Sequence, residues 1–409
     1  MSGQRAAAEP YATRFETQVT AVDGHRVWLE STHFFAESGG QPADHGTVGD
    51  VPVEGVEISD GDHVHVLAEE PSFREGSRVL CSIDWSFRMY CMRAHTASHV
   101  LYGAARRTLD DVAYAGLEIN EGAVRVDLET TDEVHDETLV TLDERVNRAV
   151  WESRPVSWES MPLADAREAD EIVVSERTEQ SAYSKGRVRV VTIGDVDEGG
   201  TNAINVASEP WDVAACGGTH VRNTREIGPV TVLGRSTPES GQVGIELAVG
   251  PRAIERRETE KRVTFAASRQ LGVPLAEASG ELSKLEAERA QLADSVGTLQ
   301  RELVKTRLES ADRFDREGRS WVATTAEVVD SNEAGEVAAE LAGELADVIV
   351  IAGEEESPFA VVAAGDDADA EAILRGLTDQ FGGGGAGSPE LAWGGDFDVD
   401  PDEVVAGLE

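Results

Sequence analysis

Two pairs of metal-ligand residues, each pair four positions apart, constrain how this chain can fold. His95 and His99 lie in the segment HTASH, and Cys216 and His220 lie far downstream in CGGTH. Residues four positions apart project from one face of a helix, so two imidazoles can bind one ion. Zinc accepts imidazole nitrogens and a thiolate together in a tetrahedral shell. The spacing therefore predicts that two distant segments meet at a zinc site; the alternative is that the histidines are core or capping residues and Cys216 an ordinary buried thiol.

Sequence periodicity divides the chain into four segments. Residues 1–88 alternate short β-like runs with Gly, Pro and Asp turns, which predicts a small N-terminal β-barrel. Residues 89–258 open with a helical pattern over 87–107, which places the two histidines beside an apolar stripe, and a second helix is predicted at 138–153. We expect an α+β, zinc-containing domain in which the Cys216 loop folds back onto the histidine helix.

The last two segments have different patterns. Residues 259–318 are helical, and apolar residues from Leu282 to Leu303 follow a 3-4 alternation. This alternation predicts a coiled-coil linker, a helical hairpin, or one amphipathic helix packed on its own domain. Residues 319–409 predict a small C-terminal α/β domain that ends in a glycine-rich loop, with a first strand near 327–330. The predicted fold class is α+β and multidomain.

The charge balance is strongly acidic. The 409 residues include 78 Asp and Glu against 36 Lys and Arg, for a net charge of −42. Such a surface repels nucleic acid at low salt, whereas molar salt shortens the Debye length to about 3 Å. We interpret the acidity as a halophilic adaptation to a salty cytoplasm; the alternative is a protein that binds basic partners. With three cysteines, no signal peptide and no long apolar run, we expect a cytoplasmic protein without a membrane partner.

Several motifs together resemble the editing domain that alanyl-tRNA synthetases share with free-standing AlaX proteins. HTASH and CGGTH match the metal motifs of that domain, with RVRVVTIGD before the second motif and TREIGPV after it. FFAESGGQP, followed by Asp44 and Gly46, resembles the glycine-rich N-terminal motif of the family. FGGGGAGSPE resembles the terminal (DHHA1-like) domain of long AlaX proteins and synthetases. The resemblance spans nearly the whole chain and is closest to the long form of AlaX.

This resemblance implies an aminoacyl-tRNA deacylase, a hydrolase of carboxylic esters. Its implied substrate is tRNA(Ala) mischarged with serine or glycine, its implied cofactor is Zn²⁺, and no DNA partner is implied. Zinc-bound water would supply the nucleophile, and no protein residue is assigned as the general base. A separate hydrolytic site is needed because a pocket that fits alanine cannot exclude glycine and discriminates weakly against serine.

The motifs also give a set of candidate site residues. The implied metal ligands are His95, His99, Cys216 and His220, and the candidates for substrate contact are Gly40, Gln41, Thr96, Ser98 and Thr219. Gly39 to Pro42 form either a tight turn of the barrel or a loop that closes on the pocket. Arg125 and Asp127 resemble an arginine–aspartate strand of the family. Asp127 is thus a candidate to orient a zinc histidine without binding the ion, although structural ion pairing is the favoured role.

Four protein ligands leave the role of zinc open. A closed shell is typical of structural zinc, whereas catalytic zinc keeps one position free. Either one of the four residues is a weak partner, or the zinc anchors the substrate's amino group by expanding its coordination. Tyr114-Ala-Gly116 stands where many family members carry a glutamine before a glycine, which leaves the serine-versus-glycine preference open as well.

Other classes of function remain as alternatives. A zinc-stabilised tRNA-binding module without catalysis, or a fragment-like paralogue of the synthetase, would carry the same motifs. A complete synthetase is not expected because the chain begins almost directly at the barrel and shows no P-loop, and a phosphoesterase is not expected because the aspartate-histidine-histidine motif is absent. A homodimer, if one forms, is expected to use the helix at 282–303 or the C-terminal domain.

Overall fold

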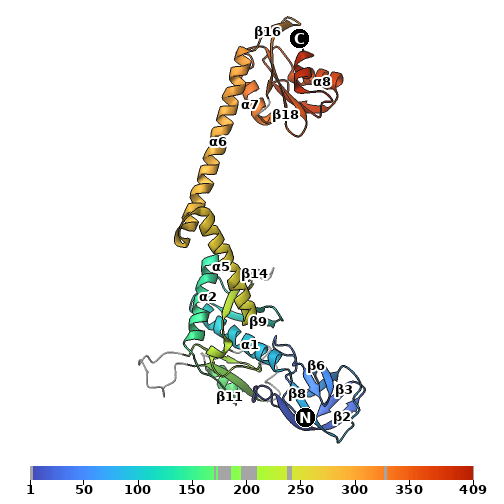
Figure 1. Ribbon diagram of the computed structural model, residues 1–409, viewed down its shortest axis with the longest axis vertical. Coiled ribbons are helices and arrows are strands. Elements are labelled where there is room, and N and C mark those ends of the chain that lie inside the picture. The colour runs from blue at the N-terminus through green and yellow to red at the C-terminus, as the bar shows by residue number, and fades with distance from the viewer. Residues whose placement is uncertain are drawn as a thin grey trace. The chain divides into compact units, whose positions relative to one another are not determined.

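The chain forms two compact units, Met1–Thr264 and Phe265–Glu409. The structure is a computed structural model that describes residues 3–169, 172–173, 186–194, 210–236, 242–326 and 329–408 (Figure 1). The fold is α+β and multidomain, as the sequence predicts. None of the described helices combines the length and the apolar character that crossing a membrane requires.

A closed six-stranded barrel forms the N-terminal part of the first unit, with strand order β2-β3-β7-β6-β5-β8. Its strands are β2 Arg14–Asp23, β3 Arg26–Leu29, β5 Gly46–Val48, β6 Val51–Ser59, β7 Asp62–Leu67 and β8 Arg78–Ile83. Two short strands, β1 Gly3–Gln4 and β4 Ser31–Thr32, pair in parallel beside it. Inward residues such as Val19, Val27 and Leu67 form its apolar core, so the predicted barrel within 1–88 is confirmed.

The helix that carries the two histidines, α1 Trp85–Ala105, runs through the middle of the first unit. The Asp84 side chain caps it by accepting hydrogen bonds from the backbone N–H groups of Ser86 and Phe87. Most residues of α1 are buried, because a sheet, a second helix and the 3-10 turn η1 Thr224–Ile227 all pack against it.

The elements around α1 form two antiparallel sheets. The larger sheet has strand order β14-β15-β10-β9. Its strands are β9 Ala113–Ile119, β10 Val124–Glu129, β14 Val230–Ser236 and β15 Gln242–Val249, and helix α2 Asp136–Trp151 packs on α1 and β14. The smaller sheet has strand order β11-β12-β13, comprises β11 Val156–Pro162, β12 Arg187–Ile193 and β13 Asp212–Ala215, and is flanked by α3 Leu163–Glu168. Strand β13 contacts α1 and ends at Ala215, so the CGGTH loop that follows begins next to α1.

The linker between the two units is helical. Helix α5 Pro251–Leu271 begins in the first unit and ends in the second, and a short turn, η2 Leu275–Glu277, precedes the 33-residue helix α6 Ala278–Ser310. The apolar residues of the 3-4 alternation are exposed on α6: Leu282, Leu285, Leu292, Val296, Leu299 and Leu303. The expectation that this stretch packs on its own domain is therefore wrong, and a coiled coil stays a prediction.

The second unit contains a six-stranded sheet of order β16-β17-β18-β19-β21-β20. Its strands are β16 Arg313–Arg316, β17 Arg319–Ala326, β18 Val348–Glu354, β19 Pro358–Ala364, β20 Gly384–Gly387 and β21 Leu391–Gly395. Helix α7 Ser331–Leu341 and the end of α6 cover one face, and α8 Ala370–Phe381 and α9 Pro401–Ala406 cover the other. The first five residues of β18, Val348 to Ala352, are all apolar because they alternate between these two covered faces.

One strand of this sheet lies elsewhere than predicted. The strand expected near 327–330 is instead β17, which ends at Ala326, and residues 327–328 lie outside the described part of the chain. Polar Ser and Thr residues interrupt the apolar alternation of β17, yet Val322 and Ala326 still point into the core beneath α7. The apolar pattern alone therefore did not reveal this strand.

Candidate metal centre

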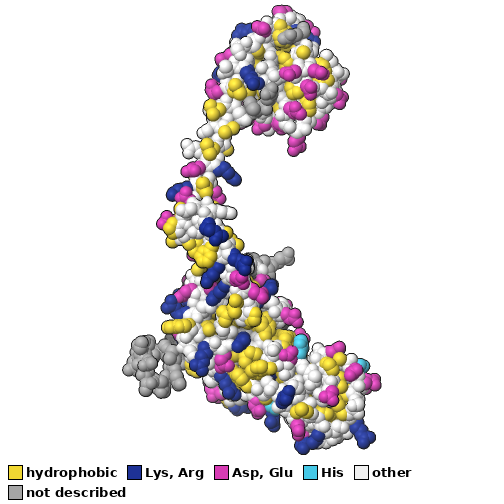
Figure 2. Space-filling model, in the orientation of Figure 1, with side chains coloured by type: hydrophobic (Ala, Val, Ile, Leu, Met, Phe, Trp, Pro, Cys, Tyr) yellow, Lys and Arg dark blue, Asp and Glu magenta, His cyan; other side chains and the backbone are white. Residues whose placement is uncertain are grey.

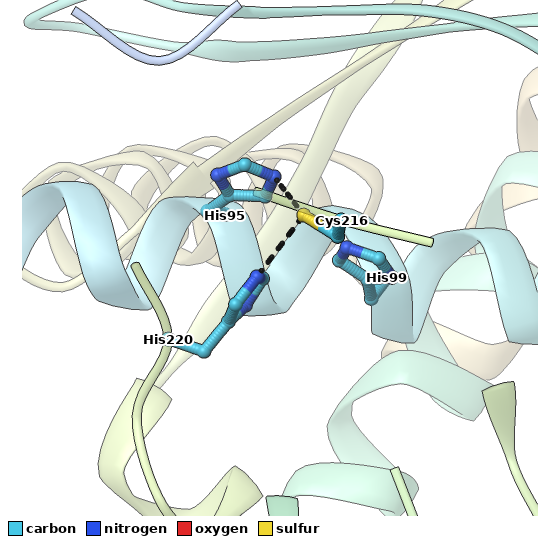
Figure 3. A group of neighbouring side chains, drawn as sticks. All are labelled: His95, His99, Cys216 and His220. Atoms are coloured by element: carbon cyan, nitrogen blue, oxygen red, sulfur yellow. Dashed lines mark hydrogen bonds between the residues drawn. The ribbon is translucent and has the colours of Figure 1, made fainter. Parts of the chain in front are cut away.

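The structure brings together the four residues that the ligand spacing singles out. One possible ligand atom from each of His95, His99, Cys216 and His220 lies within 4.8 Å of all the others. The Cys216 Sγ atom lies 3.3 Å from Nε2 of His95 and 3.3 Å from Nε2 of His220 (Figure 3). The two α1 residues and the two loop residues thus face a common point in the interior of the first unit, as a single ion requires.

The Nδ1 atom of each of the three histidines in this group is hydrogen-bonded to a neighbouring side chain. The pairs are His95 with Gln41 Oε1 at 2.9 Å, His99 with Asp212 Oδ2 at 2.7 Å, and His220 with Thr96 Oγ1 at 3.2 Å. Thr96 donates its own hydroxyl proton to the Met92 carbonyl, so its oxygen accepts from His220. Carboxylate and amide oxygens likewise only accept, which places the ring proton on Nδ1 and leaves Nε2 free to bind a metal.

The electrostatics favour a thiolate at Cys216 and a neutral imidazole at His220. Burial opposes ionisation of Cys216, but the charges of His95 and His220 hold the pKa of the thiol well below its usual value. Burial is also the largest cause that lowers the pKa of His220 to about 3. Three imidazole nitrogens and one thiolate are a donor set that Zn²⁺ prefers, and His95, Cys216 and His220 are buried. The residues present therefore fit zinc.

The charge on His99 differs from that on His220. Burial lowers its pKa, but hydrogen bonds to Asp212 and Cys216 outweigh burial and raise the pKa of His99 to about 10. Asp212 comes from β13, immediately before the CGGTH loop, and its side chain is almost fully buried. Only neutral imidazole is a metal ligand, so His99 would have to give up a proton before it could hold an ion here.

The CGGTH loop is shaped by a glycine and by a partly buried arginine. A Cβ atom on Gly218 would lie 2.1 Å from Cε1 of His95, so only glycine lets the loop approach the helix. Arg189 donates from Nη1 to the carbonyls of Cys216 and Gly218, and from Nη2 to the carbonyl of Ala7. Burial lowers the pKa of Arg189 to about 10, and its guanidinium lies over the Trp158 ring.

Sequence reasoning did not single out Arg189 or Asp212. Both were visible only as charged residues within apolar strand patterns, RVRVV and WDVAA. A charged residue in such a pattern is normally assigned to a solvent face, and only the fold shows that Asp212 is buried and that Arg189 reaches the carbonyls of the CGGTH loop.

The residues predicted for substrate contact lie around the metal ligands, and four of them are already hydrogen-bonded within the protein. Gln41, Thr96, Ser98 and Thr219 are buried. Ser98 Oγ donates to the His95 carbonyl, and Gln41 Nε2 donates to Thr219 Oγ1. Gly40 has φ +83°, and a Cβ there would lie 1.9 Å from the Leu117 carbonyl oxygen, so its immediate role is to let the loop pack on β9.

Asp127 lies apart from the histidines. Its Oδ1 atom accepts from Arg125 Nε at 2.7 Å, and both residues alternate along β10 with Val124, Val126 and Leu128, which face the core. The carboxylate that orients a histidine of the group is Asp212. The favoured interpretation of Asp127 as a structural ion-pair residue agrees with this placement.

A buried ion pair joins the barrel to α1. Arg88, one of the largest fully buried side chains, donates from Nε to Asp44 Oδ1 at 2.9 Å and also contacts Asp44 Oδ2 through Nη2. The remaining guanidinium donors reach the carbonyls of Pro10 and His33. Asp44 and Gln41 belong to the same loop of the barrel, so this pair anchors the loop that reaches His95.

Comparison with known proteins agrees with this geometry. Residues 188–246, which include Cys216 and His220, match the family described as "Threonyl and Alanyl tRNA synthetase second additional domain". The alanine–tRNA ligase of Pyrococcus abyssi is 30% identical over 399 residues, which cover 96% of this chain and 41% of the ligase. That of Thermococcus kodakarensis is 31% identical over 398 residues, which cover 94% of this chain and 41% of the ligase.

Among solved structures, the C-Ala domain of Aquifex aeolicus alanyl-tRNA synthetase matches 24% of this chain and 94% of that chain, at 23% identity and a TM-score of 0.22. A likeness of that size does not define the fold. The chain spans about two fifths of the length of the curated ligases that it matches. It is a relative of the alanyl-tRNA synthetases along nearly its whole length, and it contains the second additional domain that alanyl and threonyl synthetases share.

Proposed function

We propose that this protein hydrolyses the aminoacyl ester of mischarged tRNA(Ala), with Zn²⁺ held by His95, His99, Cys216 and His220. The observation that carries the proposal is the buried group of three imidazoles and one thiolate. Two of the four residues lie in the second additional domain, in a chain related to alanine–tRNA ligases. The proposed activity is that of an aminoacyl-tRNA deacylase acting in the cytoplasm on translation errors.

The residues of the chain divide the work of ester hydrolysis. Bound zinc would supply a Lewis acid that lowers the pKa of a water or polarises the ester carbonyl. Gln41, Asp212 and Thr96 keep the histidine Nε2 atoms available for that ion. Gly217 is exposed on the loop between two ligands, and its backbone N–H is our candidate to receive the developing oxyanion.

The coordination number decides which role zinc takes. Four protein ligands are typical of structural zinc, whereas catalytic zinc keeps one position open. His99 is the most exposed of the four and would be the weakest partner if the site were catalytic. If all four residues held the ion, it would instead serve to anchor the substrate's amino group. Both alternatives are consistent with Ser-tRNA(Ala) or Gly-tRNA(Ala) as the substrate.

Serine recognition needs a donor or acceptor that the protein does not already use. Thr219 Oγ1 accepts from Gln41 Nε2, so its own hydroxyl proton can be offered to a ligand. Thr96 and Ser98, by contrast, donate their protons to the carbonyls of Met92 and His95. Among the predicted substrate-contact side chains, Thr219 is therefore our first choice for reading the serine hydroxyl.

The test is deacylation of purified Ser-tRNA(Ala) and Gly-tRNA(Ala) by wild type, Cys216→Ala and Cys81→Ala. Cys81 is a buried thiol of the barrel core and serves as the matched control. Wild type and Cys81→Ala should bind about one zinc per chain and release the amino acid, and Cys216→Ala should lose both properties. Equal zinc content and equal rates in all three proteins would refute the assignment.

A zinc-stabilised tRNA-binding module without catalysis is the second candidate. The closed ligand shell favours it, because structural zinc sites have this form. A fragment-like paralogue of the synthetase would behave in the same way. These candidates predict zinc binding and tRNA binding by the wild type, with no release of serine or glycine above the rate of spontaneous hydrolysis.

The exposed apolar stripe on α6 is the proposed contact between two copies of the chain. Its six residues from Leu282 to Leu303 are each at least 41% exposed, and Figure 2 shows apolar side chains along this helix. Exposed leucines at heptad spacing are most simply buried against an identical helix. Sedimentation of wild type and of Leu292→Glu/Leu299→Glu tests this pairing, because only the wild type should run as a dimer.

The acidic surface sets the conditions for RNA binding. Acidic side chains are spread over the visible face of both units (Figure 2), and the net charge of the chain is −42. We expect the melting temperature and the tRNA affinity to rise with KCl toward molar concentrations, opposite to the usual salt dependence. A fall in both quantities from low salt upward would contradict the halophilic interpretation.

A further inference from the structure

Gln41 occupies a central position beside the proposed metal site. It comes from the loop between β4 and β5, and its side chain is fully buried. Its Oε1 atom accepts from His95 Nδ1 at 2.9 Å and from the Thr219 backbone N–H at 3.0 Å, and its Nε2 atom donates to Thr219 Oγ1 at 2.9 Å. One amide therefore contacts both segments that carry the ligands.

The backbone contact fixes which way the amide points. The N–H of Thr219 can only donate, so the Gln41 atom facing it must be the oxygen. The same oxygen faces Nδ1 of His95, so that nitrogen must carry the ring proton. Nε2 of His95 is then unprotonated and lies 3.3 Å from Cys216 Sγ, in the form that binds a metal.

The contact between Gln41 and His95 differs from the other two histidine contacts in the part of the chain that supplies it. Asp212 and Thr96, which hold His99 and His220, come from β13 and α1, the elements next to the ligands. Gln41 alone among these three comes from the barrel. The buried Asp44–Arg88 pair ties its loop to α1, about two helical turns before His95.

We infer that Gln41 is a positioning residue that selects the metal-binding tautomer of His95, and that the barrel is thereby a working part of the metal site. This inference rests on the proposed zinc site but not on the proposed deacylase activity. It replaces the expectation that Gln41 touches the substrate, because its carbonyl and amide groups are already engaged within a fully buried setting.

Two substitutions separate hydrogen bonding from packing. Gln41→Leu keeps nearly the same volume but removes the acceptor, and Gln41→Glu keeps an acceptor for both N–H groups. Gln18→Leu, at an exposed position of β2 in the same barrel, is the matched control. Zinc affinity is measured in the full-length protein by competition with a chromophoric chelator, and Co²⁺ absorption reports the ligand geometry.

Gln41→Leu should weaken zinc binding about 10- to 100-fold, the usual effect of losing a partner that orients a ligand histidine. Gln41→Glu should stay within a few-fold of wild type, and Gln18→Leu should be unchanged. Gln41→Leu should also alter the intensity of the Co²⁺ bands. If leucine is tolerated, or if leucine and glutamate weaken binding equally, Gln41 only fills space and the inference is overturned.

A second measurement does not depend on metal. Nitrogen chemical shifts of ¹⁵N-histidine in the metal-free protein should show His95 protonated at Nδ1 in wild type and Gln41→Glu, and a mixture of tautomers in Gln41→Leu. An unchanged tautomer in Gln41→Leu overturns the inference even if that variant has lost stability. A wild type that binds zinc and shows this pattern but releases no serine refutes the deacylase alone.

Discussion

The cores of the two units differ in what they bury. Every buried polar or charged side chain among the described residues belongs to Met1–Thr264, including Arg88, Asp44, Gln41, His95 and His220. The described core of Phe265–Glu409 consists of apolar side chains on two faces of one sheet. Buried polar groups lower stability unless they are fully paired. The first unit therefore depends on paired polar groups in its interior, whereas the described core of the second is stabilised by apolar packing.

Metal removal should give the largest difference between the two units. With free zinc at ten thousand times its dissociation constant, binding stabilises the first unit by roughly 5 kcal/mol. Adding a chelator should therefore raise hydrogen exchange in α1 and β13 but leave β18 and β19 unchanged. Cys216→Ala should show no response to the chelator. Equal deprotection of β18 and α1 would mean that the units do not differ in this way.

Breaking the Arg88–Asp44 pair should have the next largest effect. Arg88→Met leaves the Asp44 carboxylate buried without its partner, which should lower the free energy of unfolding by about 3–5 kcal/mol. Arg26→Met serves as the control, because its ion pair with Glu57 is exposed and should contribute less than about 1 kcal/mol.

Urea unfolding of the full-length variants measures both changes. Adding Asp44→Asn to Arg88→Met should restore part of the loss, since it removes the buried charge. If the double variant is no more stable than Arg88→Met, packing around Arg88 accounts for the effect, and the unpaired charge does not.

His65 should make the stability of the first unit depend on pH. Burial lowers its pKa from 6.5 to about 4, and its ring nitrogens contact Thr32 Oγ1 and the Val27 carbonyl. As pH falls from 6.5 to 4, the unfolded state takes up a proton that the folded state does not, so stability falls, by roughly 3 kcal/mol in total. Urea unfolding at several pH values should show this loss in wild type and a shallower one in His65→Gln.

The exposed His135 provides the control for that experiment. His135→Gln should keep the wild-type pH dependence. If His65→Gln keeps it as well, other buried groups of the first unit cause the acid sensitivity.

A conservative change in the second core should have the smallest effect. Ile351→Val removes one methylene from a fully buried position of β18 and should lower the free energy of unfolding by about 1 kcal/mol. Zinc content, the tautomer of His95 and the pH dependence of the first unit should stay as in wild type. A change in zinc content on this substitution would link the two cores.

Sequence patterns predicted the barrel, the multidomain α+β class and the residues that assemble at the candidate site. Alternation reveals strands wherever one face is apolar, as in the barrel. It failed at β17, where serine and threonine interrupt the apolar pattern. Ligand spacing identified His95, His99, Cys216 and His220 because histidine and cysteine, in two pairs four positions apart, form a donor set that zinc accepts.

The surroundings of those four residues could not be read from the sequence. Asp212 and Gln41 hold His99 and His95 because their side chains lie within hydrogen-bond distance of the rings. The residues next to them in the sequence do not reveal that proximity. Asp127 was the candidate that the sequence offered for orienting a histidine, with structural ion pairing as the favoured role, and in the structure it pairs with Arg125 on β10. Such contacts between distant residues depend on how helices and strands pack together. Sequence patterns do not contain that information.

The division of the metal ligands between a helix and a later loop also has a consequence during synthesis. His95 precedes Cys216 by 121 residues, so at ordinary translation rates the ribosome needs roughly 10 s to make the rest of the site after the first pair has emerged. Until then, the histidine pair has no thiolate partner. Stable uptake of an ion would thus mark the moment when the nascent first unit closes, and a pulse of labelled metal during translation would time that event.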